Sequence, residues 1–570
     1  GEIPKWPADV SYGVKERSRL AEPTPGDENA AAIGSPPLKP TFSRERGFVS
    51  SPFPLIMIAS TPQTVIRYTV DGSAPSETNG QLYRGPIQVN QTTVVRAVCL
   101  MPDCLPSRVT TASYLFPQDI LTPYQDIPEG WPPARLINGQ RLVYGMEAPM
   151  NIGATHDEFS KALVSVPTVS LVMDLDDLLD EHTGIYTHAV ERGRDWERSV
   201  SMEWIDPRDN ASSSKQTDAG LRIRGGYSRS RRAPKHGFRV IARSAYGDDK
   251  FDWPCFGSDG PNRCRTVDLR SPQNHSWSTD GSKDNTFLRD GFCRDTQRDL
   301  GRPYTRGQFV HLFLNGVYWG VYESHERVDA DYAERYLDAD PESVDVIKAA
   351  HPGVLKTVTA PREGDLNAWR HLWESANRLA AQREESVRSA LYYDLQGLSA
   401  AGAPDRDKAS YVDVPSLIDY MMIIFFSANQ DAPISQFFDN LRPNNWFAVR
   451  DRDGQDGFRF FIHDSEHSLG LPKHYGNSRI GPFEGGADFT YSNPQWLHQQ
   501  LMSVEAYREA FGDRAEALLG PGGLLSAEAN IARLSERERV LEPIMALHAA
   551  RWGSARSDRP RTKRDWRGAV

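Results

Sequence analysis

A tract of alternating residues near the middle of this chain, Phe309–Glu323, restricts its fold more than any other segment. The tract reads FVHLFLNGVYWGVYE, so two runs of aliphatic and aromatic residues flank the dipeptide Asn315-Gly316. Asn-Gly favours a two-residue hairpin turn, because both residues accept the positive φ angles that such a turn requires. The flanking residue types favour buried strands. The sequence therefore predicts an antiparallel β-hairpin, and any fold for the chain must include a sheet.

Local patterns divide the remaining chain into segments and predict the α+β class. Short β-type runs such as Val65–Val70 and Thr92–Val98, separated by turn residues, indicate a small β-sandwich. Helical periodicity prevails after Pro494, and the last 17 residues carry six basic and two acidic side chains without apolar periodicity. In chain order we expect a linker (1–45), a β-sandwich (46–117), a Pro-rich linker (118–160), a mixed domain (161–475), a helical extension (476–553) and a disordered basic tail (554–570).

The charge balance and the apolar runs exclude two kinds of partner. The 570 residues carry 66 Lys and Arg against 76 Asp and Glu, a formal net charge of −10. Such a chain lacks the dominant basic field of a nucleic-acid-binding protein. The longest apolar stretch, around Met421–Phe426, is far shorter than the ~20 residues of a membrane-spanning helix. No signal segment opens the chain at Gly1, so we expect a removed leader or a fragment.

The cysteines bear on the cellular compartment. Cys99 and Cys104 form one sequence-near couple, Cys255 and Cys264 form another, and Cys293 is left over. Such couples suit short disulfide bonds in an exported protein. Five unrelated reduced thiols fit the spacing nearly as well. The couples lack the C-x-x-C spacing of a structural zinc site. We expect a protein that is exported to the cell exterior or the envelope.

A basic segment, Arg224–Arg239, is the first candidate for chemistry. It holds six Lys and Arg side chains and no acidic one, within an acidic chain. Gly225 and Gly226 would let backbone amides approach a phosphate closely, and Lys235 would neutralise it. A solvated basic hairpin explains the same composition equally well.

The second candidate is the tract after a predicted buried helix, Leu417–Phe426. In chain order it supplies Asp431, Asn445 and then Asp464 at the end of a predicted buried strand. Phosphoryl transfer of the protein-kinase type needs this order: a carboxylate that orients the attacking hydroxyl, an amide that holds Mg²⁺, and a carboxylate that bridges metal and phosphates. Each residue alone could equally be a helix cap or a turn residue. Their order with the upstream lysine favours phosphoryl transfer.

The same tract contains a competing match, because His463–His467 fits the H-x-x-E-H signature of zinc proteases. Zinc binding by this motif needs both histidines on one face of a helix. The first histidine ends a predicted aromatic strand and Gly470-Leu471-Pro472 follows, so we expect a coincidence. Literal H-R-D and D-F-G motifs are absent from the sequence, which excludes an ordinary eukaryotic-type kinase.

Together these motifs resemble the CotH family of atypical protein kinases. The likeness covers about residues 165–475 and includes PTVSLVMDLDDL, AGLRIRGGYSRSRRAPKHGFRV, FLNGVYWGVYESHERVD, NQDAP, NNWFAVR and HDSEHSL. The resemblance implies a two-lobed protein-kinase-like domain that uses ATP and Mg²⁺ or Mn²⁺. It also implies an enzyme that phosphorylates Ser, Thr or Tyr hydroxyls of exported or cell-envelope proteins.

On the nucleotide side, the resemblance implies that Lys235 contacts the phosphates and assists catalysis. It further implies that a glutamate just after the hairpin lies near the hinge and the adenine, for which Glu323 and Glu326 are both candidates. The implied cofactor-binding residues are Lys235, Arg224, Gly225, Gly226, Glu323 and Glu326.

On the transfer side, the resemblance implies that Asp431 is the catalytic carboxylate and that Asn445 and Asp464 bind the metal. The spacing departs from the ordinary pattern, because Asn445 follows Asp431 by 14 positions, against about five in the usual kinase loop. Asn440 and Asn444 are therefore rival metal ligands.

The N-terminal module has a resemblance of its own. The stretches YTVDGSAP and TTVVRAV look like the chitobiase C-terminal β-sandwich, which implies an accessory spacer or a polysaccharide partner. The preceding VSYG…AEPTPGDENA resembles the last strands of a lamin-tail-like domain.

These extracellular likenesses support an alternative function. In that alternative, the chain is a non-catalytic surface, adhesion or scaffold protein that keeps a kinase-like fold for binding. ATP is scarce outside cells, which favours the scaffold. The ordered Lys, Asp, Asn and Asp set favours the enzyme, since a scaffold has no chemical need of it.

Overall fold

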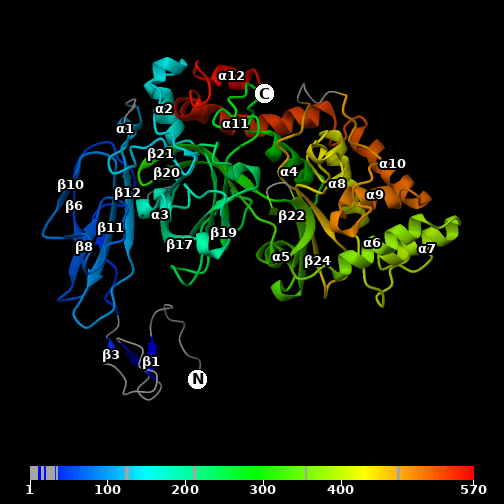
Figure 1. Cartoon of the computed structure of the whole chain (residues 1–570), viewed down its shortest axis with the longest axis horizontal. Coiled ribbons are helices and arrows are strands. Elements are labelled where there is room, and N and C mark those ends of the chain that lie inside the picture. The colour runs from blue at the N-terminus through cyan, green and yellow to red at the C-terminus, as the bar shows by residue number, and fades with distance from the viewer. Residues whose placement is uncertain are drawn as a thin grey trace.

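The computed structural model describes residues 36–570, apart from 122–126, 209–213, 354–355 and 471–475, together with three short strands, β1 (Ser11–Gly13), β2 (Ser18–Leu20) and β3 (Ala32–Ile33). Figure 1 shows an N-terminal β-sandwich, a β-barrel, a second sheet flanked by helices, and a long C-terminal helix over the barrel. The expected linker and lamin-tail-like segment, 1–45, lies largely outside the described residues.

The N-terminal module is built on a five-stranded sheet with the order β5-β12-β11-β8-β9. The strands predicted from alternation are confirmed as β8 (Val65–Thr69) and β11 (Thr93–Leu100). Every residue of β12 (Thr110–Leu115) is buried, because one face covers the module's core and the other lies against the barrel. There the Ser113 amide donates to the Glu203 carboxylate at 3.0 Å. The module's other strands are β4 (Thr41–Phe42), β5 (Gly47–Phe48), β6 (Phe53–Leu55), β7 (Met57–Ile58), β9 (Gln81–Leu82) and β10 (Ile87–Val89).

The centre of the chain is a closed barrel with the strand order β15-β16-β17-β18-β19-β21-β20. The predicted hairpin is confirmed as β20 and β21, which turn at Asn315-Gly316. Alternate residues such as Leu221, Phe238 and Leu269 fill the barrel. The strands are β15 (Thr168–Val172), β16 (Arg198–Ile205), β17 (Lys215–Arg224), β18 (Gly237–Ile241), β19 (Thr266–Arg270), β20 (Gly307–Leu314) and β21 (Val317–His325).

The outer face of β17, β18 and β19 is charged, because successive side chains of a strand point to opposite faces. Arg224, Arg239, Asp268 and Arg270 alternate there with the barrel-filling residues. Asp268 accepts hydrogen bonds from Arg239 at 2.6 and 2.7 Å and pairs with Arg224 at 3.1 Å. This face is turned towards the second sheet, since Arg270 reaches Asp464 just beyond that sheet.

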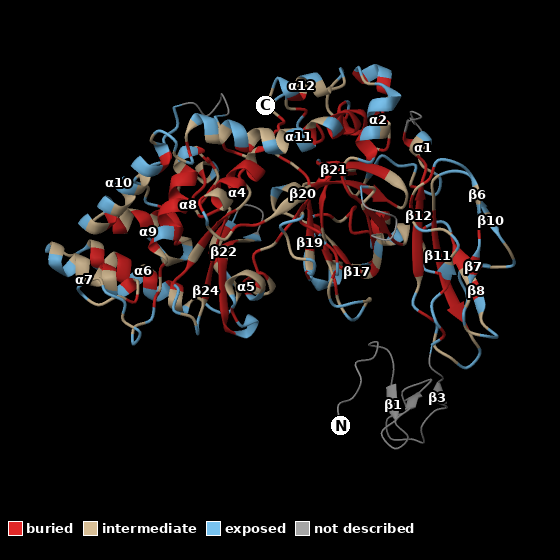
Figure 2. Cartoon of the chain, turned by 180° about the vertical axis from the view of Figure 1, so that it is seen from behind, coloured by how far each residue is buried: buried red, intermediate tan, exposed pale blue. Residues whose placement is uncertain are grey.

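The second sheet is antiparallel with the order β23-β22-β24-β25. Its core includes Trp369, Leu417, Trp446 and Phe460, and the predicted buried helix is confirmed as α8. Figure 2 shows buried residues concentrated in the barrel strands and in this sheet with its helices. The elements are β22 (Val344–Gly353), β23 (Lys356–Glu363), β24 (Trp446–Asp451), β25 (Arg459–Ile462), α4 (Arg289–Asp299), α6 (Asn367–Ala380), α7 (Glu385–Leu395), α8 (Val414–Phe426), α9 (Pro494–Leu501) and α10 (Glu505–Leu519).

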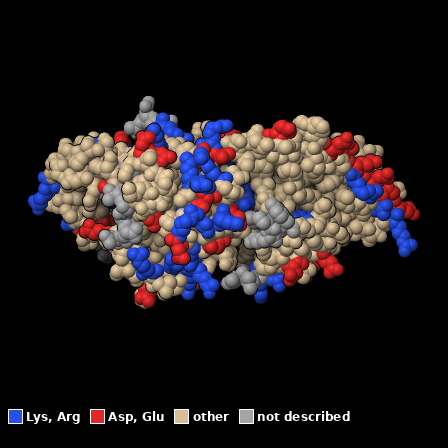
Figure 3. Space-filling model, turned by 90° about the horizontal axis from the view of Figure 1, so that it is seen from above, with Lys and Arg blue, Asp and Glu red and all other residues tan. Residues whose placement is uncertain are grey.

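The surface charge and the helices can be compared with the two expected exclusions, nucleic-acid binding and a membrane span. Seen from above in Figure 3, basic and acidic side chains are interspersed over the middle of the molecule. No helix in the described part of the chain combines the length and apolarity needed to cross a membrane.

The structure corrects the linker expected at 118–160, because part of it is folded. Helix α2 (His156–Leu163) begins with a capping box between Thr155 and Glu158. It buries Phe159 in the core that it shares with α11 (Ala527–Trp552). A short helix, α1 (Pro117–Leu121), and the paired strands β13 (Leu136–Ile137) and β14 (Gln140–Arg141) precede it.

The disordered tail expected at 554–570 is also corrected, because it ends in helix α12 (Lys563–Arg567). Thr562 and Asp565 form a capping box. Trp566 is fully buried, and its Nε1 donates to the Thr286 carbonyl at 2.8 Å. One large apolar side chain anchors a segment whose composition otherwise indicates disorder.

Replacing Trp566 with Ala should destabilise the protein by about 3–5 kcal/mol, because a large buried ring is removed and a cavity remains. Denaturant unfolding of wild type and variant measures the difference. The control is Val570→Ala at an exposed position of the same tail, which should unfold like the wild type. Equal stability of the Trp566 variant would show that the tail is not docked.

The chain leaves the barrel for the second sheet through helix α5 (Ala330–Leu337), which Asp329 caps. The Asp329 carboxylate accepts a hydrogen bond from the Tyr332 amide at 3.0 Å. Burial, together with the negative charge of Glu363, raises the pKa of Asp329 from 3.8 to about 7. The folded state therefore holds a proton here that the unfolded state has lost between about pH 4 and 7, so this group stabilises the fold less as the pH rises through that range.

An Asp329→Asn variant keeps an N-cap of comparable quality and removes this titration. We expect its melting temperature, relative to wild type, to rise between pH 5 and pH 8. Asp413→Asn, the same change at the cap of α8, is the matched control. A difference for Asp329→Asn that is constant with pH, or that falls, would contradict the expectation.

Candidate functional site

The loop that follows α8 holds Asp431 in a network of hydrogen bonds. Its Oδ1 accepts from Asn444 Nδ2 at 2.9 Å and from the Ser435 hydroxyl, and its Oδ2 accepts from Asn445 Nδ2 at 2.9 Å. Asn445 has a φ of +51°, a left-handed conformation that Asn tolerates better than most residues. The side-chain amides of Asn444 and Asn445 thus both donate to the Asp431 carboxylate.

The surroundings of Asp431 change its acidity. Burial, aided by the negative charge of Asp464, raises its pKa to about 6, although the hydrogen bonds from Ser435 and Asn444 lower it. A carboxylate with this pKa is ionised at neutral pH and is a stronger base than an ordinary aspartate.

Asp464 lies two residues beyond the end of β25 and belongs to the same cluster. Asn445 Nδ2, which donates to Asp431, also lies 3.5 Å from the Asp464 carbonyl oxygen. The Asp464 carboxylate pairs with Arg270 at 2.6 Å. Burial is the largest influence and opposes ionisation, but the charges of Arg270 and His463, together with the hydrogen bond from Arg270, outweigh it and lower the pKa of Asp464. The structure therefore brings together the three residues that the sequence selected in this tract.

Arg270 is a residue of the site that sequence reasoning missed. It lies at the end of β19, is buried, and contacts Asp464 at 2.6 Å and Glu466 at 2.7 Å. It also lies 3.6 Å from Asp290 in the first turn of α4. The alternation in the stretch TVDLR places Arg270 on the same face as Asp268, and this was the available signal.

Lys235 is not brought to these carboxylates. Its ammonium is fully buried and donates to the Val321 carbonyl at 2.6 Å, above the ring of Tyr322 at 4.3 Å. Burial lowers its pKa well below the ordinary value. The lysine lies in the loop before β18 and points towards the barrel strand β21, away from the charged outer face.

The glycine pair does lie beside the site. Gly225 has a φ of +112° and follows Arg224 at the end of β17. A Cβ atom on Gly226 would lie 3.9 Å from Nε2 of His351, which belongs to β22. His351 in turn lies beside Asn444. The backbone of Gly226 thus lies beside His351 of the second sheet, which in turn neighbours Asn444 of the Asp431 cluster.

Cationic side chains lie between the charged outer face of the barrel and strand β22 of the second sheet, a region that we call the gap. Lys348 on β22 is half-buried, and its pKa is lowered to about 8 by burial and by neighbouring arginines, Arg239 first among them. Its ammonium lies 5.7 Å from the Phe447 ring. No carboxylate of a described residue lies within ion-pair distance of it. Among the described residues, Lys348 therefore adds an unpaired positive charge beside the charged outer face of the barrel.

The two glutamates after the hairpin are engaged in ion pairs. Glu323 lies opposite Arg270 in the β19–β21 pairing, and its carboxylate contacts Arg294 and, at 3.0 Å, Arg537. Glu326 is fully buried and accepts from the Arg306 amide at 3.1 Å. It follows β21 where the chain leaves the barrel, whereas Glu323 lies within the strand.

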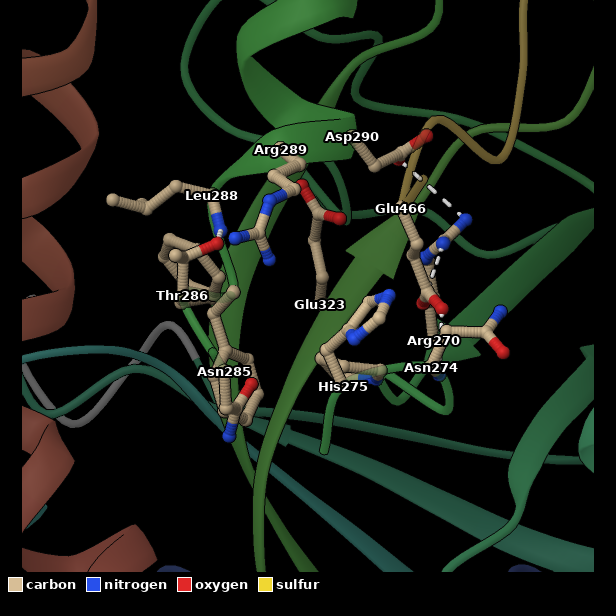
Figure 4. Close-up of a pocket in the computed structure, with 13 residues that line it drawn as sticks. Arg270, Asn274, His275, Asn285, Thr286, Leu288, Arg289, Asp290, Glu323 and Glu466 are labelled. Carbon is tan, nitrogen blue, oxygen red and sulfur yellow. Dashed lines mark hydrogen bonds and ion pairs between the residues drawn. The ribbon is translucent and has the colours of Figure 1, made fainter. Parts of the chain in front are cut away.

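A small pocket lies behind Arg270, as Figure 4 shows. Arg270, Asn274 and Glu466 form one side, and Glu323 lies across from them. Its volume of about 30 Å³ is room for one or two water molecules and not for a nucleotide base. The pocket is therefore part of the ion-pair network rather than a ligand site.

Residues 463–467 do not form the helix that zinc-protease chemistry needs. His463 packs on Phe447, with ring centroids 4.9 Å apart. His467 lies near His275, with ring nitrogens 3.3 Å apart. In the part of the chain that the structure describes, no group of three or more His, Cys, Asp and Glu side chains is arranged to hold a metal.

The oxygen atoms of the cluster nevertheless fit Mg²⁺. Asn445 donates through its nitrogen, which leaves its amide oxygen as an acceptor. Asn444 Oδ1 is buried, with His351 as its polar neighbour, whereas Asn440 Oδ1 accepts from Arg479 at 2.6 Å. Mg²⁺ is bound by one or two carboxylates together with phosphate oxygens. Asp464 with Asn445 or Asn444 supplies such a sparse set.

Comparison with protein-family models settles the relationship. A model described as CotH kinase protein matches residues 221–570, more than half of the chain. The chain belongs to the CotH kinase family. A second model, described as Fn3 associated, matches residues 56–114, inside the module predicted at 46–117. No curated protein matches this CotH-family chain.

The match also covers the C-terminal helices. It extends to residue 570, beyond the end predicted at 475, and so includes the helices assigned to a separate extension, 476–553. Packing gives the reason, because α9 and α10 contact α8 and α11 contacts β21 of the barrel. These helices complete the cores of the CotH domain.

Proposed function

We propose that the chain is an ATP:protein phosphotransferase of the CotH type, dependent on Mg²⁺ or Mn²⁺. Its acceptors are Ser, Thr or Tyr hydroxyls of exported or cell-envelope proteins. One observation carries the proposal: Asn445 contacts both Asp431 and Asp464. These residues have the chemical types and the order in the chain that phosphoryl transfer needs.

The proposed fold is a two-lobed, kinase-like one, with the barrel as one lobe and the second sheet with its helices as the other. Two observations support it. The charged outer face of the barrel turns towards the second sheet through Arg270 and Asp464. Glu326 stands at the start of the segment that connects the two, where the resemblance places the hinge.

In the proposed reaction, Asp431 accepts a hydrogen bond from the acceptor hydroxyl and then takes its proton. The acceptor oxygen forms a bond to the γ-phosphorus, and the bond from that phosphorus to the bridging oxygen breaks, which leaves ADP. Asp464 and Asn445 would hold a divalent cation, which when bound neutralises the charge on the phosphates. The raised pKa of Asp431, about 6, suits it to accept the proton near neutral pH.

Cations other than Lys235 would contact the phosphates. Arg270 already pairs with Asp464, and Lys348 lies in the same gap without a carboxylate partner among the described residues. Arg270 also lies 3.6 Å from Asp290 of α4, an arrangement similar to the strand-lysine and helix-glutamate pair of ordinary kinases. Gly225 and Gly226 would cover the phosphates with backbone.

Transfer of labelled γ-phosphate from ATP tests the proposal, with a generic acceptor protein and with the chain itself as acceptor. We expect incorporation with Mg²⁺ or Mn²⁺ and none with EDTA. The scaffold alternative is favoured by the N-terminal module, which docks on the barrel through buried groups. Absence of incorporation, together with absence of a metal-dependent effect of ATP on melting temperature, would favour that alternative.

A further inference from the structure

The five cysteines take no part in the proposed phosphotransfer, and the structure distinguishes one couple from the other. The thiols of Cys255 and Cys264 are in hydrogen-bonding contact. No such contact joins Cys99 to Cys104 among the described residues. Cys293 lies apart in α4, next to Ser468. Sequence spacing ranked the two couples equally, and the fold brings only one of them together.

The backbone holds Cys255 and Cys264 in place. Cys264 is in a two-way antiparallel bridge with Phe251, with hydrogen bonds of 2.7 and 3.0 Å. The Cys255 amide donates to the Trp253 carbonyl at 2.8 Å. The two cysteines are 0% and 1% exposed. Both side chains are therefore buried at the two ends of an exposed turn, and because the thiols already touch, a bond between them needs little movement.

We infer that Cys255 and Cys264 form a disulfide bond in the exported protein. Together the two thiols lose two protons and two electrons to a disulfide donor, which is reduced to two thiols. The first cysteine forms a mixed disulfide with the donor, and the second displaces the donor's remaining thiol. Burial raises the pKa of the Cys255 thiol well above its ordinary value, and the thiolate is the reactive form. The bond therefore forms during folding, before the segment is buried.

The bond would lock the connection between β18 and β19 against the end of the barrel. The Cys255 carbonyl accepts from the Ser324 hydroxyl at 2.5 Å, and the Asp259 carbonyl accepts from Arg306 at 2.9 Å. Arg306 also contacts Glu326, where the chain leaves the barrel. A short closed loop would thus brace the start of the connection to the second sheet. The inference does not depend on phosphotransferase activity.

Mass spectrometry of the full chain tests the inference without any variant. The protein is refolded with oxidised and reduced glutathione, denatured with an alkylating reagent and digested with trypsin, which cleaves after Lys250, Arg263 and Arg265. We expect the peptides 251–263 and 264–265 joined and two hydrogens lighter than their sum, with Cys99, Cys104 and Cys293 alkylated. Alkylation of both Cys255 and Cys264, or a glutathione adduct on either, would overturn the inference.

Melting temperature gives a second measurement. A phosphine reductant should lower the melting temperature of the oxidised protein by at least about 3 °C, because closing a loop restricts the unfolded chain. A Cys255→Ser, Cys264→Ser double variant should show no response to the reductant. The matched control, Cys99→Ser with Cys104→Ser, should respond like the wild type. A response lost in the control and kept in the first variant would assign the bond to the other couple.

Discussion

In the proposed reaction, an Asp464→Asn variant should transfer γ-phosphate at least about 100-fold more slowly than the wild type, because it removes a negative charge that would hold the metal. The fold should survive, since the Asp464 side chain is 38% exposed and Asn is nearly isosteric. Arg270 would keep Glu466 and Asp290 as partners. Initial rates of labelled phosphate transfer, with circular dichroism to verify folding, measure the effect.

The matched control is Asp439→Asn, an exposed position in the same tract with a φ of +55°. This variant should retain the wild-type rate, because Asn adopts the left-handed conformation at least as readily as Asp. Unimpaired transfer by Asp464→Asn would exclude Asp464 from the metal site. Equal loss in both variants would indicate a general defect of the tract.

Replacing Arg270 with Ala should cause the largest loss of stability among single changes at the site, about 3–5 kcal/mol. Arg270 is only 5% exposed. Its removal leaves the carboxylates of Asp464 and Glu466 without the cation that pairs with them, whereas Asp290 keeps Arg294. Denaturant unfolding followed by tryptophan fluorescence measures the difference.

The control is Arg265→Ala, just before the same strand, where the guanidinium is 55% exposed and lies 3.8 Å from Asp331. It should change stability by less than about 1 kcal/mol, as exposed ion pairs do. An Arg270→Lys variant should retain part of the lost stability, because it restores the charge without the fork-shaped geometry. Wild-type stability of Arg270→Ala would show that Asp464 and Glu466 do not depend on this arginine.

Local patterns predicted the elements that carry the transfer residues. The hairpin of β20 and β21 is encoded by alternation around Asn315-Gly316, and α8 by one continuous apolar run. Asp431 and Asp464 lie within five residues after the ends of α8 and β25, so their place in the fold follows from the sequence around them. Asp431 and Asp464 come together because α8 and β25 pack against each other.

The residues that complete the site depend on pairings between distant segments. Whether Lys235 or Arg270 faces the second sheet is decided by how β19 pairs with β18 and β21. Composition favours Lys235, whereas the structure places Arg270 against Asp464. Lys348 belongs to a strand whose neighbour in the sheet, β24, comes about 100 residues later. Trp566 is the one aromatic residue in a basic tail, and its partner Thr286 lies 280 positions earlier. The periodicity of the local sequence carries no signal for such contacts.

The way in which the N-terminal module is seated determines what it can do for the rest of the protein. Arg46 and Glu203 form a buried ion pair at 3.0 Å across the junction, and Ser113 bonds to Ser170 at 2.8 Å beside it. A flexible tether would let an enzyme sample every acceptor within reach of its anchor. A module mounted in this way instead has one fixed orientation on the barrel. Any surface that it bound would be held at one distance and one angle from the barrel.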